Sequence, residues 1–466
     1  MKAFADSIDL TDARPRPRLF LRRICVRTPA WASKRRGGGS DPRSHAGGAP
    51  PAAPAEAGQQ AWTGGWGTAQ HASYDPGTSE VTVRIPVRVS AGGSSARIRL
   101  TNGFTTEPVT IGHATVGRRD SDASVAKPYQ LRFGGRDEVT IAAGEQAVSD
   151  SVRLPVPARS DLVVGLYFPG RLTHISQHWM GLQTVYWTPD GSGDHAGDAG
   201  GGAFTRTDST FPFLTGVDVR GGDVGGSVVA LGDSITDGAA STANADRRWP
   251  DYLAGRLSAC STTAGVLNEG ISGNRITAGT DGNPSALDRL ERDVLSQPGA
   301  RTVILFEGVN DLSWGSVTGA QVIDGMKEIA RRAHARGLRV IGATVVPYRG
   351  WGDWWTEAKE ADRQRVNTFV RDSGGVFDGY ADFDRAVRDP ADPPATPRVR
   401  LGRPSAPQRQ RDEGVRRRRR PGRPRVARDC PPPACGSPRT CRACGPGTAR
   451  RSRRPSPTPA AAPIRR

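Results

Sequence analysis

Apolar and polar positions alternate along residues 62–215, a pattern typical of strands with one buried face. The run "EVTVRIPVRVSAGGSSARIRLTNGF" alternates on both sides of a Gly-Gly-Ser-Ser turn, which predicts a β-hairpin. Similar short strands recur in "VTIGHATV", "YQLRF", "EVTIAAG", "DLVVGLYF" and "LQTVYW", with no convincing long helix between them. The pattern predicts a β-sandwich or jelly-roll-like domain over 62–215, in which "TPDGSGDHAGDAGGGAF" (188–204) is a loop.

The pattern changes at residue 226, where continuous apolar runs begin to alternate with helical periodicity. Strands are predicted at "SVVALGD", "TVILFEG", "RVIGATVVPY" and "GVFDGYADF", and helices at "RRWPDYLAGRL", "TGAQVIDGMKEIARRAHARGL" and "WTEAKEADRQRVNTFVRDS". Alternating helices and buried strands predict an α/β domain over 226–393, with a parallel sheet between two layers of helices. In such sheets the chemistry lies at the carboxyl ends of the strands.

Both ends of the chain lack these patterns and are predicted to be disordered. Residues 1–60 include "RPRPRLFLRRICVRTPAWAS", which ends like a signal cleavage site, but Arg22, Arg23 and Arg27 interrupt the apolar stretch that a signal peptide needs. "GGAPPAAPAEAGQQ" then predicts a flexible linker. Residues 394–466 are dominated by Arg, Pro, Ala, Gly and Cys and form a predicted basic tail.

The net charge of +18 comes from that tail. Residues 394–466 hold 21 Arg, no Lys and three acidic residues, and the other 393 residues carry 44 basic and 44 acidic side chains. The tail lacks interleaved aromatic residues and any nucleic-acid-binding module, so the charge does not predict a specific nucleic-acid partner. A basic arm for an anionic surface and an appendage with no role remain alternatives. No run of 18 or more apolar residues occurs, so no membrane-spanning helix is predicted.

Four of the six cysteines also lie in the tail: Cys430, Cys435, Cys441 and Cys444. Only the last two have a spacing familiar from zinc sites, and their Pro- and Arg-rich flanks offer little apolar support for a metal. We therefore predict no metal site.

Three short stretches place candidate chemistry at the ends of predicted strands. In "VVALGDSITDG", Ser234 follows a buried strand and precedes a helix, where N–H groups can stabilise an oxyanion; the alternative is that Asp233 or Ser234 only caps the helix. In "LNEGISGNR", Gly273 lies in a Gly/Asn turn that can aim a backbone N–H at an oxyanion. In "FEGVNDL", Asn310 offers a side-chain amide for the same purpose.

These three stretches, in this order, resemble the blocks of the SGNH hydrolases, the GDSL-like esterase/lipase superfamily. The resemblance implies a three-layer, flavodoxin-like α/β/α domain, with Ser234 as nucleophile and Gly273 and Asn310 as oxyanion donors. It implies no cofactor and no metal. The β-rich segment before it resembles, more softly, the N-terminal sandwich of two-domain bacterial members, which are often exported.

The family's fourth block, Asp-x-x-His, is absent. The seven histidines are His45, His71, His113, His174, His178, His195 and His334, and none follows residue 334. His334 is predicted to be an exposed helix residue, and His174 and His178 to take part in packing or a domain contact. Asp382 and Asp384 are predicted to be structural. A serine nucleophile needs a base, which the chain does not supply where the family places it.

Family character ends at Pro393, where the composition changes abruptly. If the codons for residues 398–414 are translated in a frame shifted by one base, the degeneracy of the code permits a sequence that contains Asp-x-x-His followed by Pro-Asn. We therefore hypothesise a one-base frameshift near residues 393–397.

The sequence thus predicts a serine esterase acting on short acyl, sugar or lipid esters, whose activity as written is in doubt. The alternative is a non-catalytic pseudo-hydrolase or carbohydrate-binding protein. Trp351, Trp354 and Trp355 are predicted either to line the cleft or to pack. Acyl and alcohol specificity, location and oligomeric state are left open; the resemblance points to an extracellular protein, and no clear signal peptide supports this.

Overall fold

The computed structural model describes residues 61–259, 263–279 and 282–391. The predicted terminal segments, the cysteine cluster and the hypothesised frameshift lie outside the described residues, and the predicted domain boundaries remain predictions. Within the described part of the chain, no helix is both long and apolar enough to cross a membrane.

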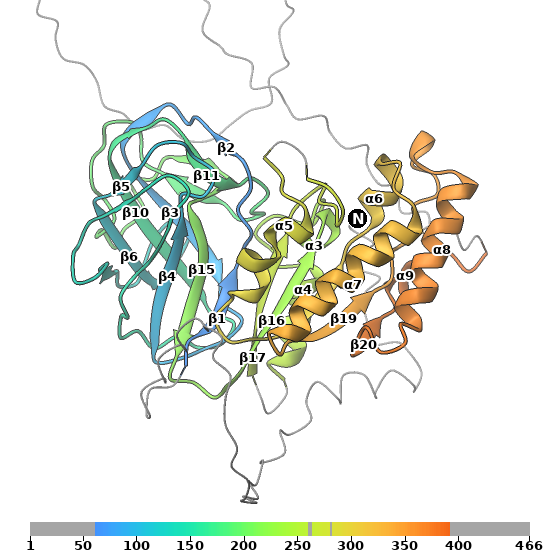
Figure 1. Ribbon diagram of the computed structural model, residues 1–466. Coiled ribbons are helices and arrows are strands. Elements are labelled where there is room, and N and C mark those ends of the chain that lie inside the picture. Colours follow the sequence, from blue (N-terminus) through green and yellow to red (C-terminus); the bar gives the residue numbers. More distant parts are fainter. Residues whose placement is uncertain (1–60, 260–262, 280–281, 392–466) are drawn as a thin grey trace, which may run out of the picture. The chain divides into compact units, whose positions relative to one another are not determined.

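Antiparallel sheets occupy residues 63–220. The two largest have the strand orders β13-β12-β3-β10-β6-β7 and β1-β15-β4-β9; smaller sheets have the orders β14-β11-β2 and β5-β8. Figure 1 labels strands of each sheet, among them β3, β4, β5 and β11. The bounds are β1 Thr63–Gly67, β2 Ser73–Tyr74, β3 Thr78–Arg88, β4 Ser95–Thr101, β5 Val109–Ile111, β6 His113–Arg118, β7 Tyr129–Leu131, β8 Val139–Ile141, β9 Gln146–Val148, β10 Asp161–Leu172, β11 Ile175–His178, β12 Val185–Trp187, β13 Arg206–Asp208, β14 Phe211–Pro212 and β15 Leu214–Arg220.

The predicted hairpin is wrong, although both of its strands form. β3 pairs with β10 and β12, whereas β4 pairs with β15 and β9, so the Gly-Gly-Ser-Ser turn leads from one sheet into another. Apolar side chains of both sheets, such as Val83 and Ile98, share one core cluster. Burial explains the difference. With β3 and β4 in different sheets, the apolar side chains of the two strands can pack against each other across the core, whereas in one hairpin they would lie side by side. The antiparallel β-region is confirmed; its finer assignment as a sandwich or jelly roll stays a prediction.

The second half of the described chain is an α/β region around a parallel five-stranded sheet of order β17-β16-β18-β19-β20. The strands are β16 Val224–Gly232, β17 Thr263–Gly270, β18 Ala300–Phe306, β19 Arg339–Ala343 and β20 Gly379–Ala381. The helices are α3 Ser234–Asp237, α4 Trp249–Leu257, α5 Ala286–Leu290, a π-helical turn Glu291–Leu295, α6 Val309–Trp314, α7 Gly319–Ala335, a 3-10 turn Gly352–Trp354, α8 Glu357–Arg371 and α9 Phe383–Val387 (Figure 1).

Both faces of this sheet are covered, as the continuous apolar strands predict. Along β16, Val229 and Leu231 join a cluster with residues of α5, α7 and α8, whereas Val228 and Ala230 join a cluster with residues of α4 and α9. Local signals also act as expected: α7 begins at a capping box in which Thr318 accepts from the N–H of Gln321. The predicted parallel α/β organisation is therefore confirmed.

Hydrogen bonds join the antiparallel region to the parallel sheet. Ser227 Oγ, on β16, donates to Gly64 O on β1 at 3.1 Å, and Thr68 forms a parallel bridge with Asn268 on β17. The antiparallel region thus continues along the β17 side of the parallel sheet, next to the strands whose ends carry the site.

Candidate active site

Ser234 lies where β16 ends and α3 begins. Asp233 is the N-cap of α3, and its Oδ1 accepts from Ile235 N at 2.9 Å. The capping role that the sequence left open therefore belongs to Asp233, and the half-buried Ser234 is the first helical residue. Burial raises the pKa of Asp233 to about 7, and the charges of Asp311 and Asp237 act in the same direction.

Gly273 lies in the turn after β17. The preceding Ile271 N donates to Gly232 O at 2.9 Å, which ties this turn to the end of β16. Gly273 has a φ of +81°, and a Cβ added there would lie 3.3 Å from the Trp314 ring. Both its backbone conformation and its space therefore favour glycine at this position.

Asn310 lies in the first turn of α6, after β18, and is buried. Its Nδ2 donates to Asn274 O at 2.9 Å, so it contacts the residue that follows Gly273. Asp311 accepts from the N–H groups of Ile276 at 2.9 Å and Thr277 at 3.0 Å. Both polar residues of "GVND" thus hold the segment that contains Gly273.

The strand order explains why these residues meet. The chain passes from β16 to β17 on one side and then crosses back to β18 on the other side of β16, so the direction in which strands are added reverses at β16. A crevice for a ligand forms outside the carboxyl ends of parallel strands where the order reverses in this way. Ser234 follows β16 and Asn310 follows β18, on the two sides of that switch point. The N–H groups of Ser234 and Gly273 have no acceptor among the residues that the structure describes, so both remain available to an oxyanion.

A buried arginine, which the sequence interpretation missed, supports this edge. Arg289 of α5 donates to Gly232 O at 3.0 Å, to Glu269 O at 2.7 Å and to Asn274 Oδ1 at 2.9 Å. It therefore links the ends of β16 and β17 to the turn that holds Gly273. Apart from Asp293, four residues further along the chain, its partners are backbone carbonyls and side chains distant in the sequence, so no local motif marks this set of contacts.

Two glutamates lie buried in the same region. Burial raises the pKa of Glu269 to about 8, with the charge of Asp293 acting in the same direction. Burial also raises the pKa of Glu307 well above its usual range, as does the neighbouring charge of Asp233. Neither Glu307 oxygen has a hydrogen-bond partner within the described residues. The raised pKa values favour neutral carboxyl groups, and burying a neutral carboxyl group costs less free energy than burying a carboxylate.

No described histidine is hydrogen-bonded to Ser234. His113, on β6, contacts Asp194, and His195 contacts Asp198 within the 188–204 loop. His334 Nε2 lies 2.9 Å from Asp378 Oδ2 and is half-exposed on α7. His174 is exposed, and His178 makes the predicted contact between the two regions. The position of the family's fourth block lies outside the described residues.

Asp382 and Asp384 have structural partners, as predicted. Arg371 donates to Asp382 Oδ1 at 2.8 Å and to Asp384 Oδ2 at 2.6 Å, and the buried Arg363 donates to Asp384 Oδ1 at 2.6 Å. These ion pairs fix α9 against α8. Across the described ranges, no group of three or more His, Cys, Asp or Glu side chains is arranged to hold a metal ion.

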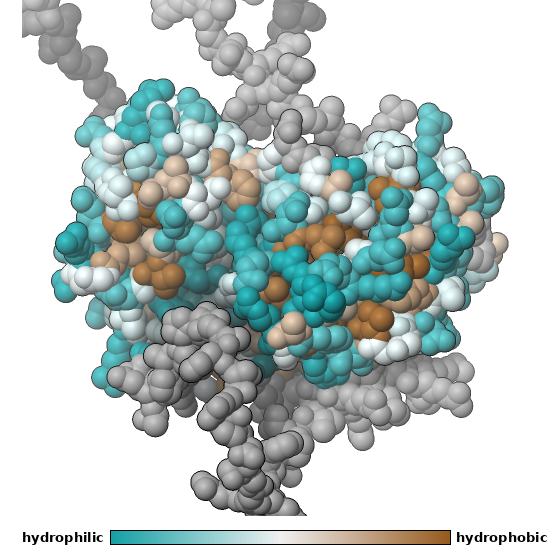
Figure 2. All heavy atoms as spheres, in the orientation of Figure 1, coloured by the Kyte–Doolittle hydropathy of each residue, from teal (hydrophilic) through white to brown (hydrophobic). Residues whose placement is uncertain are grey.

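The tryptophans divide between packing and exposure. Trp351 and Trp355 pack against the core cluster of α7 and α8, whereas Trp354 is 45% exposed. Trp354 meets Trp314 edge to face, with ring centroids 5.8 Å apart, and Trp314 is 50% exposed. On the face shown in Figure 2, hydrophilic residues cover most of the surface and hydrophobic residues form patches between them. Trp314 and Trp354 form an exposed aromatic pair, of which Trp314 lies beside Gly273.

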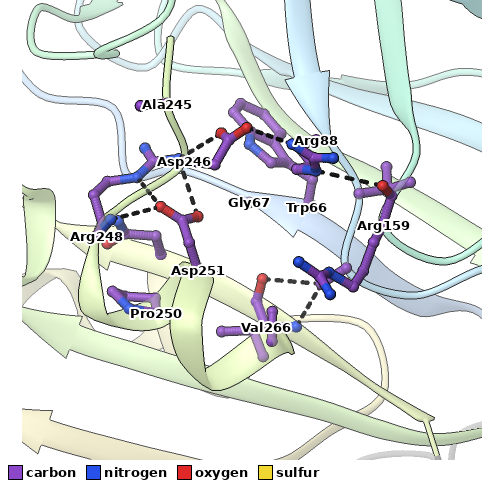
Figure 3. A pocket seen from close by; sticks show the side chains of 14 residues that line it. Trp66, Gly67, Arg88, Arg159, Ala245, Asp246, Arg248, Pro250, Asp251 and Val266 are labelled. Carbon is purple, nitrogen blue, oxygen red and sulfur yellow. Dashed lines mark hydrogen bonds and ion pairs between the residues drawn. The ribbon is translucent and has the colours of Figure 1, made fainter. Parts of the chain in front are cut away.

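A cavity of about 140 Å³ lies between β3 and α4 (Figure 3). Four of its charged side chains form ion pairs: Arg88 lies 2.8 Å from Asp246, and Arg248 lies 2.8 Å from Asp251. None of Ser234, Gly273 and Asn310 lines it. The cavity is therefore a polar contact between the two regions and not part of the candidate active site.

Comparisons with known proteins agree with the order of these motifs. Residues 230–401 match the model of the GDSL-like Lipase/Acylhydrolase family. No curated protein sequence matches the chain.

Solved structures with a similar fold include a putative lipolytic protein of the G-D-S-L family from Desulfitobacterium hafniense DCB-2, at 20% identity over 37% of this chain and 84% of that one, with a TM-score of 0.29. A family two carbohydrate esterase from Cellvibrio japonicus is 13% identical over 68% of this chain and 84% of that one, with a TM-score of 0.28. The SGNH-hydrolase family esterase AlinE4 is 18% identical over 34% of this chain and 78% of that one, with a TM-score of 0.27.

With TM-scores this low, the structural likenesses carry no argument about the site, and the assignment rests on the family match and its motifs. Residues 230–401 are a domain of the GDSL-like lipase/acylhydrolase family, and this match supports ester hydrolysis at the level of the family.

Proposed function

We propose that the chain cleaves carboxylic esters with Ser234 as nucleophile and with Gly273 and Asn310 as oxyanion donors. One observation carries the proposal. The N–H groups of Ser234 and Gly273 lack acceptors among the described residues, and the turn that holds Gly273 is bonded both to the end of β16 and to Asn310. Preorganised donors of this kind, aimed at developing negative charge, are usually the largest single contribution to catalysis.

In the proposed reaction, Ser234 Oγ attacks the acyl carbonyl carbon and loses its proton to a base. The carbonyl oxygen becomes an oxyanion, which accepts from the Ser234 and Gly273 N–H groups and from Asn310 Nδ2. The C–O bond to the alcohol then breaks, and the alcohol leaves with a proton. Water attacks the resulting ester of Ser234, releases the carboxylic acid and restores the serine.

No histidine follows residue 334, and no described histidine is hydrogen-bonded to Ser234, so in this proposal solvent or buffer acts as the base. Loss of a triad member costs several powers of ten in rate, whereas the oxyanion donors and substrate binding alone still give about 10³–10⁴-fold over water. We therefore expect slow turnover of esters with good leaving groups, and acceleration by an added base.

The experiment compares p-nitrophenyl acetate hydrolysis by the full chain and by its Ser234→Ala variant, with and without imidazole. Imidazole supplies the missing base. The rate measured with Ser234→Ala gives the direct attack of imidazole on the ester, and this rate is subtracted from that of the wild type. We expect Ser234-dependent hydrolysis that rises with imidazole, and an acetyl group on Ser234 by mass spectrometry. Ser241→Ala, four residues beyond α3, is the matched control and should behave like wild type. Equal rates for wild type and Ser234→Ala at every imidazole concentration would reject the proposal.

For the alcohol, the exposed tryptophan pair favours a sugar. Trp314 lies against Gly273, and Trp354 extends the aromatic surface away from it. Aromatic faces present a flat apolar surface with little conformational entropy to lose, which suits the C–H faces of a sugar ring. The same surface supports the alternative function, carbohydrate binding without turnover.

Titration with an acetylated oligosaccharide, followed by tryptophan fluorescence, separates these two functions. Binding that Trp314→Ala abolishes, together with release of acetate that Ser234→Ala abolishes, supports a sugar-ester hydrolase. Binding without acetate release, even in imidazole, supports the binding protein. A wild-type chain that does not bind the oligosaccharide contradicts the sugar assignment.

A further inference from the structure

Asp237, the last residue of α3, holds the turn that contains Gly273. Its Oδ2 accepts from Ser272 N at 2.9 Å and from Ser272 Oγ at 2.6 Å. The Asp237 side chain is buried. These two bonds hold the Ile271–Ser272 peptide and the Ser272 side chain. The next peptide, Ser272–Gly273, carries the Gly273 N–H, and its carbonyl oxygen accepts from Asn283 Nδ2 at 3.3 Å.

The other oxygen of Asp237 contacts a histidine from the antiparallel region. His178, the last residue of β11, has its Nε2 3.1 Å from Asp237 Oδ1 and its Nδ1 2.8 Å from Ala69 O. A carbonyl oxygen only accepts, so Nδ1 carries a proton and donates. The Nε2 contact then needs a second proton, carried by the ring or by Asp237. In both cases the pair is neutral overall, which lowers the cost of burying it.

The surroundings of His178 leave its ring one orientation. Phe211 stacks on it at 6.1 Å between centroids, and His71 packs edge to face at 5.4 Å. Burial lowers the pKa of His71 to about 3, and the nearby His178 acts in the same direction, so His71 is neutral and adds no competing charge. His178 is 3% exposed, and it therefore directs its Nε2 at Asp237 without water between them.

Other contacts hold the two sides of this turn: Ile271 N donates to Gly232 O, and Asn274 is bound by Arg289 and Asn310. Asp237 acts between them, on the N–H and the hydroxyl of Ser272. Gly273 has a φ of +81°, a conformation available to glycine at the cost of a flexible backbone. α3 has only four residues, so its own hydrogen bonds do not hold Asp237 firmly. A donor that moves by about 1 Å loses much of its effect on a transition state.

We propose that His178 is a positioning residue, which fixes the direction of the Gly273 N–H through Asp237 and Ser272. The antiparallel region would thus supply one support of the oxyanion site on the parallel sheet. The catalytic meaning of this contact rests on the proposed function, whereas its effect on the turn does not. His178 itself touches no reacting atom in this proposal.

The test combines hydrogen exchange with kinetics on the full chain. His178→Ala removes the contact with Asp237, and His178→Gln keeps an N–H donor of similar reach. His334→Ala is the matched control, because it removes an Nε2–carboxylate contact of similar length on α7. For His178→Ala we expect amide exchange in residues 271–275 to rise at least about tenfold. We also expect the Ser234-dependent kcat with imidazole to fall about 10- to 100-fold at nearly constant KM. His178→Gln should restore part of both, and His334→Ala should change neither.

Each outcome decides the proposal. Unchanged exchange of residues 271–275 in a folded His178→Ala variant overturns it. So does increased exchange without loss of kcat, or a loss that appears only in KM. If His178→Ala does not fold, His178→Asn serves in its place, because its shorter amide leaves Asp237 out of reach. If wild type shows no Ser234-dependent turnover, the proposed function fails, and the exchange measurement alone still decides whether His178 holds the turn.

Discussion

Two fully buried arginines show how differently the two regions use the same side chain. Arg84 of β3, in the antiparallel region, donates to four carbonyl oxygens: those of Ala123, Gly200, His195 and Asp198. Its guanidinium also lies 4.3 Å from the centre of the Phe204 ring. These partners belong to loops that cover the sheet. Arg289, in the parallel region, binds instead the ends of the strands that carry the candidate site.

The difference lies in what each cation organises. Arg84 satisfies backbone groups of the 188–204 loop, which has no ladder of its own, so its role is to close a surface over β3. Arg289 lies among buried carboxyl groups, with Asp293 at 3.2 Å and Glu307 at 3.6 Å. It also binds Asn274, the residue that follows Gly273. Buried charge thus stabilises a loop in one region and orders a reactive edge in the other.

Replacing each arginine by methionine should separate these roles and gives the largest expected effect. Both variants should lose about 3–5 kcal/mol of unfolding free energy, because each leaves buried acceptors without a partner. Only Arg289→Met should also abolish Ser234-dependent hydrolysis in the fraction that remains folded. Urea unfolding and hydrolysis per folded molecule measure the two effects. Equal loss of activity in Arg84→Met would remove the distinction between the regions.

Asn310→Ala should affect activity far more than stability. We expect kcat with imidazole to fall about 10²–10³-fold, because one oxyanion donor is lost. The unfolding free energy should fall by about 1 kcal/mol, the usual value of the one hydrogen bond to Asn274. Asn310→Asp, which keeps the shape and adds negative charge, should be at least as slow. A kcat within threefold of wild type in both variants would exclude Asn310 as a donor.

His71→Leu should stabilise the protein, by about 1–3 kcal/mol at pH 7, because neither His71 nitrogen has a hydrogen-bond partner within the described residues. The gain should grow on acidification. The pKa of His71 is about 3 when folded and about 6.5 when unfolded, so between these values only the unfolded state binds the proton and wild-type stability falls with falling pH. Melting temperatures of both proteins from pH 7 to pH 4 measure this. A constant difference across that range contradicts a buried neutral His71.

The smallest effect is expected at the exposed contact between His334 and Asp378 in the parallel region. His334→Gln should change the unfolding free energy by less than about 1 kcal/mol, because its contact with Asp378 is half-exposed and screened by salt. Thermal unfolding at low and high salt measures it. If the variant lost as much unfolding free energy as the buried-arginine variants, an exposed polar contact would stabilise the protein as much as a buried one, which contradicts this expectation.

The sequence alone predicted much of the α/β region. Its continuous apolar strands, helical periodicities and strand-end motifs depend on local chemistry, and the structure has strands or helices at each of those stretches. The contact of His178 between the regions and the structural partners of Asp382 and Asp384 also agree with the predictions. The roles of Ser234, Gly273 and Asn310 stay predictions, although the structure brings their segments together.

Long-range pairing escaped the sequence for a physical reason. Alternation gives a strand its buried face but not its partner, so β3 and β4 read as a hairpin although they belong to different sheets. The roles of Arg289 and Asp237 could not be predicted from the residues around them, because most of their partners are backbone groups and side chains on other elements. The sequence by itself determined the elements, the nucleophile candidate and the absence of a histidine after residue 334. Only the tertiary structure decided which strands pair, and which buried charges and which histidine support the turn of Gly273, since those contacts depend on segments that meet only after folding.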